Sequence, residues 1–219
     1  MVKMSRLALL SGLLIVACAC AARTSTVTVV VPPQIDLKAR EVIGVIGFTA
    51  PSKGDLGPLV TRRFVESARR DQGLVRVVEL GSQEQALRSV GKSRLDAEAL
   101  AAIGRAAGVK TILVGALTVS KVKPDVRLAA DLRAGSVSAQ VDATLAVQMI
   151  EASSGASLWS RSAGASQSVG HVTLLGGGRF YLDADDPARA YGGLVDDLVE
   201  RVTRPFHVSW ERREVAPAS

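Results

Sequence analysis

Residues 42–48 (VIGVIGF) give the clearest indication of the fold class. Almost every position in it is apolar, and this pattern predicts a β-strand that is buried on both of its faces. Such a strand needs packed elements on either side of the sheet to which it belongs. We therefore expect residues 42–48 to form a central strand with helices covering the sheet.

The segments that follow this strand alternate between helix and strand patterns. Pro58 stands at a favoured first helical position, and Ser82 with Gln85 three residues later forms a capping box. Apolar residues recur with the period of a helix from near Ser93, and Gly108 marks the end of this helix. This order predicts helices packed on a sheet with right-handed crossovers. The expected elements are a helix at 58–72, a strand at 74–80, helices at 82–91 and 93–108, and a strand at 109–119.

The second half of the chain has the period-two pattern of antiparallel strands. Apolar residues occupy the odd positions of 137–149 and the even positions of 126–134. Residues 135–136 (GS) lie between these two rows and predict a two-residue hairpin loop that pairs Ala134 with Val137. This pairing places both apolar rows on the same face of the hairpin.

Beyond this hairpin the sequence predicts a second hairpin and a last helix. A turn at 153–155 leads to a return strand at 156–162, and a glycine-rich stretch follows at 164–178. Asp186 and Pro187 begin the last helix as its cap and first residue. The expected fold class is α/β (α+β): a central mixed sheet flanked by helices, with an antiparallel hairpin half and a C-terminal helix.

The N-terminus has the layout of an exported lipoprotein. Residues 1–17 carry two basic side chains and then an apolar run that is too short to span a membrane, as in a secretory signal peptide. The junction that ends at Cys18 resembles the bacterial lipobox, in which the cysteine becomes the lipidated first residue after cleavage. The alternative is an ordinary signal peptide that is cut near 17–22. In lipoproteins of Gram-negative bacteria, an aspartate directly after the lipidated cysteine is associated with retention in the inner membrane. This chain has Ala19 there, which implies an anchor in the outer membrane, on its periplasmic side.

Length and boundaries together predict one folded domain. A chain of 219 residues accommodates one domain or at most two. The expected parts are a signal peptide at 1–17, a lipidated tether at 18–37, a single α/β domain at 38–210 and a solvated tail at 211–219.

The composition offers little catalytic or nucleic-acid chemistry. Lys plus Arg number 27 against 21 Asp plus Glu, but the charges are dispersed and aromatic residues make up only 4%, so no nucleic acid partner is expected. His171 and His207 have no further metal-ligating residues at the spacing that a metal site needs. Asp183, Asp185 and Asp186 fit a helix-capping loop better than a calcium loop. We expect no enzymatic activity, no metal site and no cofactor.

The basic face of the helix at 58–72 is interpreted as solvated, with a binding patch as the alternative. It carries Arg62, Arg63, Glu66, Arg69 and Arg70.

Four stretches in chain order carry a family resemblance. They are 42–48 (VIGVIGF), 75–80 (VRVVEL), 108–117 (GVKTILVGAL) and 147–159 (VQMIEASSGASLW), the last with Glu151 and Ser154 in the places of an acid and a threonine. Together they resemble the curli secretion lipoprotein family (CsgG-like), whose fold is related to the N-terminal domain of TolB and to LpoB. The resemblance covers residues 42–162 and implies a lipid-anchored domain that self-associates or scaffolds other envelope proteins.

We therefore expect an outer-membrane-anchored periplasmic lipoprotein that acts as a binding or scaffold module in envelope assembly or secretion. Its expected partners are the membrane, through the lipid anchor, and envelope proteins or further copies of itself. The alternative that the resemblance implies is a pore-forming subunit of an oligomeric secretion channel, with candidate inserted hairpins at 121–136 and 166–185. The residues expected at such a hairpin, or at a partner-binding edge, are Val126, Leu128, Ala130, Leu132, Ala134 and Val137.

Overall fold

The computed structural model describes residues 25–51, 55–128, 135–169, 173–175, 179–181 and 186–215. The chain divides into two compact units: Pro33–His207 is one, and Met1–Pro32 with Val208–Ser219 is the other. Cys18, Ala130, Leu132, Ala134, His171, Asp183 and Asp185, to which the sequence analysis gave roles, lie outside the described residues.

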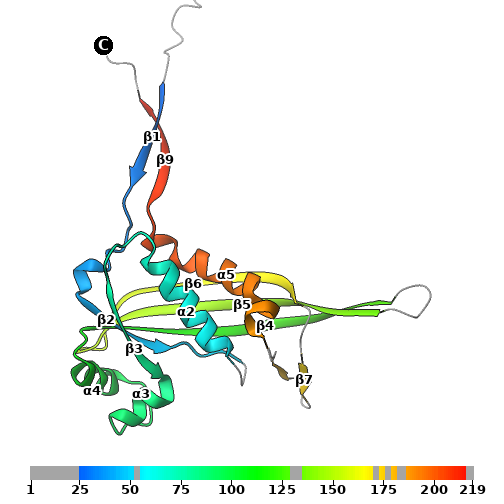
Figure 1. Cartoon of the computed structure of the whole chain (residues 1–219), viewed down its shortest axis with the longest axis horizontal. Coiled ribbons are helices and arrows are strands. Elements are labelled where there is room, and N and C mark those ends of the chain that lie inside the picture. The colour runs from blue at the N-terminus through cyan, green and yellow to red at the C-terminus, as the bar shows by residue number, and fades with distance from the viewer. Residues whose placement is uncertain are drawn as a thin grey trace, which may run out of the picture. The chain divides into compact units, whose positions relative to one another are not determined.

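A mixed sheet forms the centre of the larger unit (Figure 1). Among the described residues, five strands lie in the order β3-β2-β4-β5-β6. β2 runs parallel to both of its neighbours, and the pairs β4–β5 and β5–β6 are antiparallel. This arrangement confirms the predicted fold class. The strands are β2 (Val42–Gly47), β3 (Arg76–Ser82), β4 (Thr111–Leu128), β5 (Gly135–Glu151) and β6 (Ser157–Val169).

Two long helices cover one face of this sheet, α2 (Leu56–Arg69) and α5 (Pro187–Thr203). They enclose an aromatic cluster in which ring centroids lie 5.2 Å apart for Phe48 and Phe64, 6.1 Å for Phe64 and Phe206, and 4.9 Å for Trp159 and Phe206. Phe206 belongs to the short helix η2 (Arg204–Phe206), which follows α5 directly. Among the described helices, none is both long and apolar enough to cross a membrane.

Two shorter helices, α3 (Gln83–Ser89) and α4 (Ala97–Ala107), pack on the other face around Ile46, Ile112 and Ile103. The capping box of Ser82 and Gln85 is confirmed at the start of α3. The predicted start of α4 near Ser93 is wrong, because Asp96 itself is extended and accepts a hydrogen bond from the Ala99 backbone N–H at 2.9 Å. Gly108 ends α4 in the left-handed conformation, with φ +65°.

The predicted register of the first hairpin is wrong. Val126 lies opposite Val137, and residues 135–136 belong to β5, where they pair with Leu128 and Arg127. β4 is therefore one long strand, which begins at Thr111 and stays paired with β5 throughout its described length.

A β-bulge at Ser120 explains the change of apolar phase along β4. Before it, odd-numbered residues of β4 such as Leu117 pair with odd-numbered residues of β5 such as Leu145. After it, even-numbered residues such as Val126 take these positions opposite Val137. One extra residue on one strand shifts the alternation by one position, and the apolar row stays in register across the bulge.

The second hairpin turns where the sequence predicts, with Gly155 at φ +72°. Its return strand is longer than expected, because β6 continues through Gly164 to Val169 and pairs with β5 up to Ala139. The first part of the glycine-rich stretch at 164–178 is therefore strand. Two three-residue strands, β7 (Thr173–Leu175) and β8 (Arg179–Tyr181), pair with each other farther along.

The smaller unit contains an antiparallel ribbon of two strands, β1 (Ser25–Val31) and β9 (Ser209–Val215). Residues 211–215 of the expected solvated tail therefore form a strand, in which 211–214 are exposed, and part of the expected tether is also a strand. The β-branched run of β1 supplies a pairing partner for the polar residues of β9. Because these partners stand at opposite ends of the sequence, no local pattern predicts their pairing.

Candidate functional site

The sheet face opposite α2 and α5 is only partly covered. On this face, β5 presents Ile150, which is buried against α3 and α4, followed by the exposed residues Gln148 and Ala146. β6 continues the same face with Ser160 and Ser162, which lie directly opposite these two residues in the register. The cover of helices therefore ends partway across the sheet, between Ile150 and Gln148 of β5.

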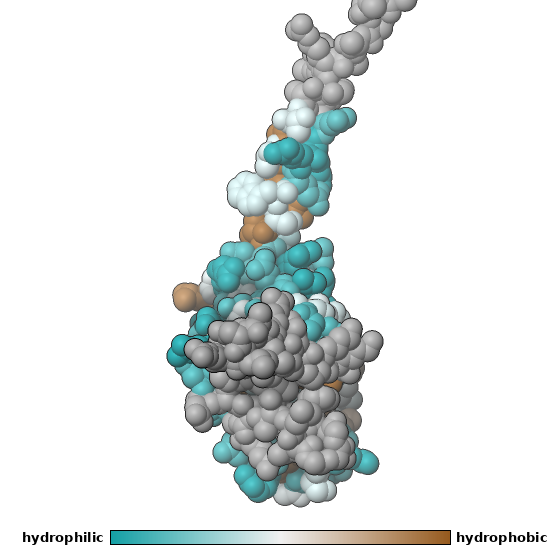
Figure 2. Space-filling view, turned by 90° about the vertical axis from the view of Figure 1, so that its right-hand side faces the viewer, coloured by the Kyte–Doolittle hydropathy of each residue, from teal (hydrophilic) through white to brown (hydrophobic). Residues whose placement is uncertain are grey.

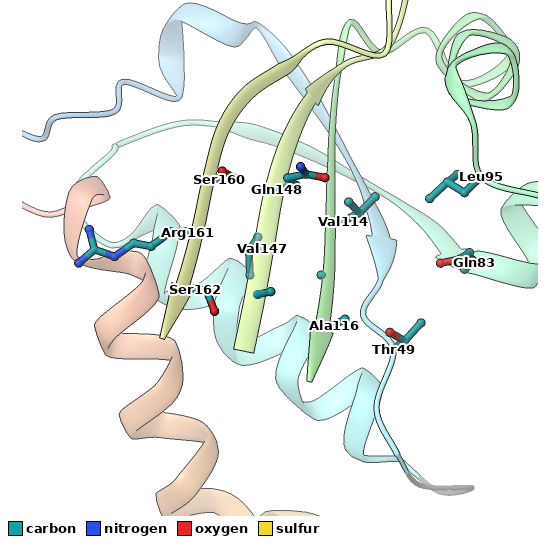
Figure 3. A pocket seen from close by; sticks show the side chains of 12 residues that line it. Thr49, Gln83, Leu95, Val114, Ala116, Val147, Gln148, Ser160, Arg161 and Ser162 are labelled. Carbon is teal, nitrogen blue, oxygen red and sulfur yellow. The ribbon is translucent and has the colours of Figure 1, made fainter. Parts of the chain in front are cut away.

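A groove with a volume of about 440 Å³ lies where the cover ends (Figure 3). Half-buried residues of β4 and exposed residues of β5 and β6 form its floor, with Val114, Ala146 and Ser160 among the lining residues. Thr49, after β2, also lines the groove, as do Gln83 of α3 and Leu95, which precedes α4. Six separate segments of the chain thus meet at one surface.

The side chains of this groove are small and mostly uncharged. Ala116 and Ala146 are apolar, and Gln148, Ser160 and Ser162 offer amide and hydroxyl hydrogen-bonding groups. Arg161 also lines the groove, but it pairs with the buried residue Val147 and so belongs to the opposite face of β6. A groove lined by these groups fits a neutral polypeptide surface better than it fits an anion or a metal ion.

β6 is the edge strand of the described sheet beside this groove. Arg161 is its single charged residue across Ser157–Val169. Edge strands with few charges offer backbone groups to a further strand. One of these groups is already used, because Arg201 Nη1 donates a hydrogen bond of 3.2 Å to the carbonyl oxygen of Gly164. Asp197 holds this guanidinium with two hydrogen bonds, and this hydrogen bonding raises the pKa of Arg201.

The basic face predicted on α2 is exposed and borders a second, smaller pocket. This pocket has a volume of about 220 Å³ and lies between α2 and α5. Arg63 Nε lies 3.6 Å from Asp196 Oδ1 there, and both side chains are well exposed. Exposed ion pairs of this kind contribute little to stability. The pocket therefore mixes charges of both signs and shows no site for one class of ligand.

A partly buried polar network joins the ends of α2 and α5. Ser67 Oγ lies 2.8 Å from Thr203 Oγ1 and 3.2 Å from His207 Nε2, and His207 Nδ1 lies 3.1 Å from Asp71 Oδ2. These distances resemble a Ser-His-Asp triad. Ser67, however, is only 7% exposed and shares its hydroxyl with Thr203. It lies inside α2, where the backbone N–H groups bond to helix carbonyls and so are not free to form an oxyanion hole. The network thus ties two helices together.

The predicted site residues are only partly described, and those that are do not meet in the groove. Val126 and Leu128 lie near the end of β4, and Val137 lies on β5 opposite Val126. Sequence reasoning missed the groove residues. The available signal was the row of small polar residues at even positions of 160–168, which marks an uncovered strand face. Among the described residues, no three His, Cys, Asp or Glu side chains are grouped as a metal site.

Comparisons with known proteins give structural neighbours only. No family model and no curated protein matches the chain. The PelC dodecamer from Paraburkholderia phytofirmans is similar, with a TM-score of 0.42, 13% identity, and coverage of 83% of this chain and 97% of that chain. Lipoprotein GNA1162 from Neisseria meningitidis has a TM-score of 0.39 and 13% identity, covering 73% and 96%. The LpoB C-terminal domain from Escherichia coli has a TM-score of 0.35 and 18% identity, covering 58% and 83%. The neighbours thus include a bacterial lipoprotein.

Proposed function

We propose that the chain is a lipid-anchored scaffold module on the periplasmic face of the outer membrane, related to the curli secretion lipoproteins. It binds an envelope protein, or a second copy of itself, through the groove on β4, β5 and β6. The observation that carries this proposal is the groove of about 440 Å³ on a sheet face that helices leave open. The lipobox-like junction at Cys18 supports the anchor.

The groove suits protein binding for two physical reasons. Its mixture of apolar side chains and neutral hydrogen-bonding groups resembles the buried centre of protein interfaces, from which charged residues are depleted. The neighbouring edge of β6 offers backbone groups to a partner strand. We propose that no reaction is catalysed and that neither a cofactor nor a nucleic acid takes part.

Site-specific photo-crosslinking tests this proposal. A photoreactive amino acid replaces Ser162 in the groove or, as a control, Arg105 on the exposed surface of α4 in the full-length protein in living cells. We expect a defined adduct from position 162, to an envelope protein or to the chain itself, identified by mass spectrometry. No adduct at 162, or the same adducts from both positions, would contradict the proposed site.

The pore-forming alternative gains no support from the described residues. It is tested by light scattering on the full-length protein extracted in mild detergent. A monomer or dimer is the result expected for a scaffold module. A closed ring of many subunits that conducts ions in a planar bilayer would replace the scaffold proposal with the channel.

A further inference from the structure

The ribbon of β1 and β9 exposes large apolar side chains. Trp210 is 69% exposed and Val30 is 51% exposed, while Val27, which is 46% exposed, projects from the opposite face of the ribbon. Val30 and Trp210 lie directly opposite each other in the register, so they share one face of the ribbon. Figure 2 shows brown, apolar surface along this ribbon. A ribbon of two strands is marginally stable in water, so burial of this face would stabilise it.

The same face carries the chemistry of a membrane interface. Tryptophan combines an apolar ring with an N–H donor and is enriched at the level of lipid headgroups. Arg212 stands two residues after Trp210 and therefore projects from the same face, within reach of lipid phosphates. β9 carries two acidic and two basic residues, so the attraction comes from Trp210 and Val30 rather than from net charge.

The position of the ribbon in the chain identifies the surface that it meets. This step rests on the proposed lipidation of Cys18. Ser25, the first residue of β1, follows Cys18 by seven residues. Seven extended residues span at most about 25 Å, so an acylated Cys18 keeps the ribbon close to the leaflet that holds the acyl chains.

We propose that the ribbon of β1 and β9 is a lipid-contacting element, in which Trp210 and Val30 enter the headgroup region of the anchoring membrane while Arg212 pairs with lipid phosphate. The contact adds a second attachment to the acyl anchor. It also brings the C-terminal strand to the membrane, because β9 is paired with β1 along its whole length.

Tryptophan fluorescence in vesicles tests this inference on the full lipidated chain. The protein has two tryptophans, so a Trp159→Phe variant reports on Trp210 alone. It is reconstituted into phosphatidylethanolamine and phosphatidylglycerol vesicles with or without brominated acyl chains. We expect the brominated lipids to reduce Trp210 emission about twofold or more. In the matched Trp210→Phe variant, Trp159 packs on Phe206 and its emission should not change.

The experiment distinguishes a ribbon that does not contact lipid from a chain that has no lipid anchor. Chains that float with the vesicles but show no quenching of Trp210 would overturn the lipid contact and leave the anchor standing. If mass spectrometry finds Cys18 without acyl chains, the anchor fails, and the unmodified chain is titrated with the same vesicles. An apparent affinity for the vesicles, measured from this quenching, that falls about tenfold on Val30→Ser would then support the contact. No quenching, or a blue shift that depends on protein concentration alone, would overturn it in favour of pairing between two copies.

Discussion

Gln72 Nε2 donates a hydrogen bond of 2.6 Å to the main-chain oxygen of Phe206, 134 residues farther along the chain. The same amide nitrogen donates to the Ile35 oxygen at 2.9 Å, and Gln72 Oε1 accepts from the Leu37 N–H at 2.9 Å. Gln72 is 2% exposed and follows the end of α2. One side chain thus satisfies the backbone of both the segment that enters the larger unit and the segment that leaves it.

Gln72→Ala is expected to lower the free energy of unfolding by about 2 to 4 kcal/mol, because it leaves buried backbone groups without partners. Chemical denaturation measures this change. Gln140→Ala removes an exposed glutamine of β5 and should stay within about 0.5 kcal/mol of the parent protein. Equal effects of the two substitutions would show that the Gln72 amide does not hold these segments.

Gly104→Ala in α4 is expected to destabilise the fold by about 1 to 3 kcal/mol, since overpacking strains a core. An added Cβ would lie 2.5 Å from Ala152 Cβ and 2.9 Å from the Val109 carbonyl oxygen. Gly192→Ala in α5 is the matched control, because a Cβ there meets nothing within 4 Å. Alanine at 192 should raise the melting temperature, as it favours the helix. A neutral Gly104→Ala would contradict the close packing of α4.

Asp96 makes the stability of α4 depend on pH. The hydrogen bond from the Ala99 backbone N–H lowers the pKa of Asp96 from its ordinary value of 3.8. Because the folded pKa is the lower one, the carboxylate stabilises the fold above its ordinary pKa, and this contribution is lost as the pH falls through the lowered value.

Asp96→Asn keeps a good cap without a charge. Melting temperatures measured from about pH 6 to about pH 2 should show the parent protein losing stability relative to this variant below about pH 4. A difference in melting temperature between the two proteins that stays constant with pH would contradict the hydrogen bond from the Ala99 N–H to Asp96.

Ala146→Arg should abolish the adduct formed from position 162, because it places bulk and charge on the groove floor. The melting temperature should stay nearly unchanged, since Ala146 is exposed. Ala106→Arg makes the same substitution on the exposed face of α4 and should leave the adduct intact. If both variants keep the adduct, the partner does not bind in the groove.

Ser67→Ala is expected to destabilise the protein by about 1 kcal/mol, because Thr203 and His207 each lose a hydrogen-bonding partner. In the parent protein, a fluorophosphonate probe should leave Ser67 unmodified, as judged by intact mass. Covalent labelling of Ser67 would contradict the structural role of this network and the proposal that the chain is not an enzyme.

The antiparallel half shows how far an alternating pattern predicts a sheet. The predicted pairing of Ala134 with Val137 and the observed pairing of Val126 with Val137 differ by eight residues. An even shift leaves every side chain on its original face, so a period of two cannot distinguish these registers. The register is set instead at the core end, where Leu113 and Leu117 pair with Met149 and Leu145 and all four are buried.

Elements with local signals can be predicted from the amino-acid sequence. The all-apolar run became β2, the capping box of Ser82 begins α3, and Asp186 with Pro187 begins α5. Each signal acts within a few residues, through burial or a single hydrogen bond.

Three features follow from the fold as a whole: the pairing of β1 with β9, the bulge at Ser120 and the groove at the edge of the helical cover. These features depend on contacts between segments that are far apart in the chain. Such contacts are selected by the packing of the whole sheet, and no short stretch of sequence encodes them.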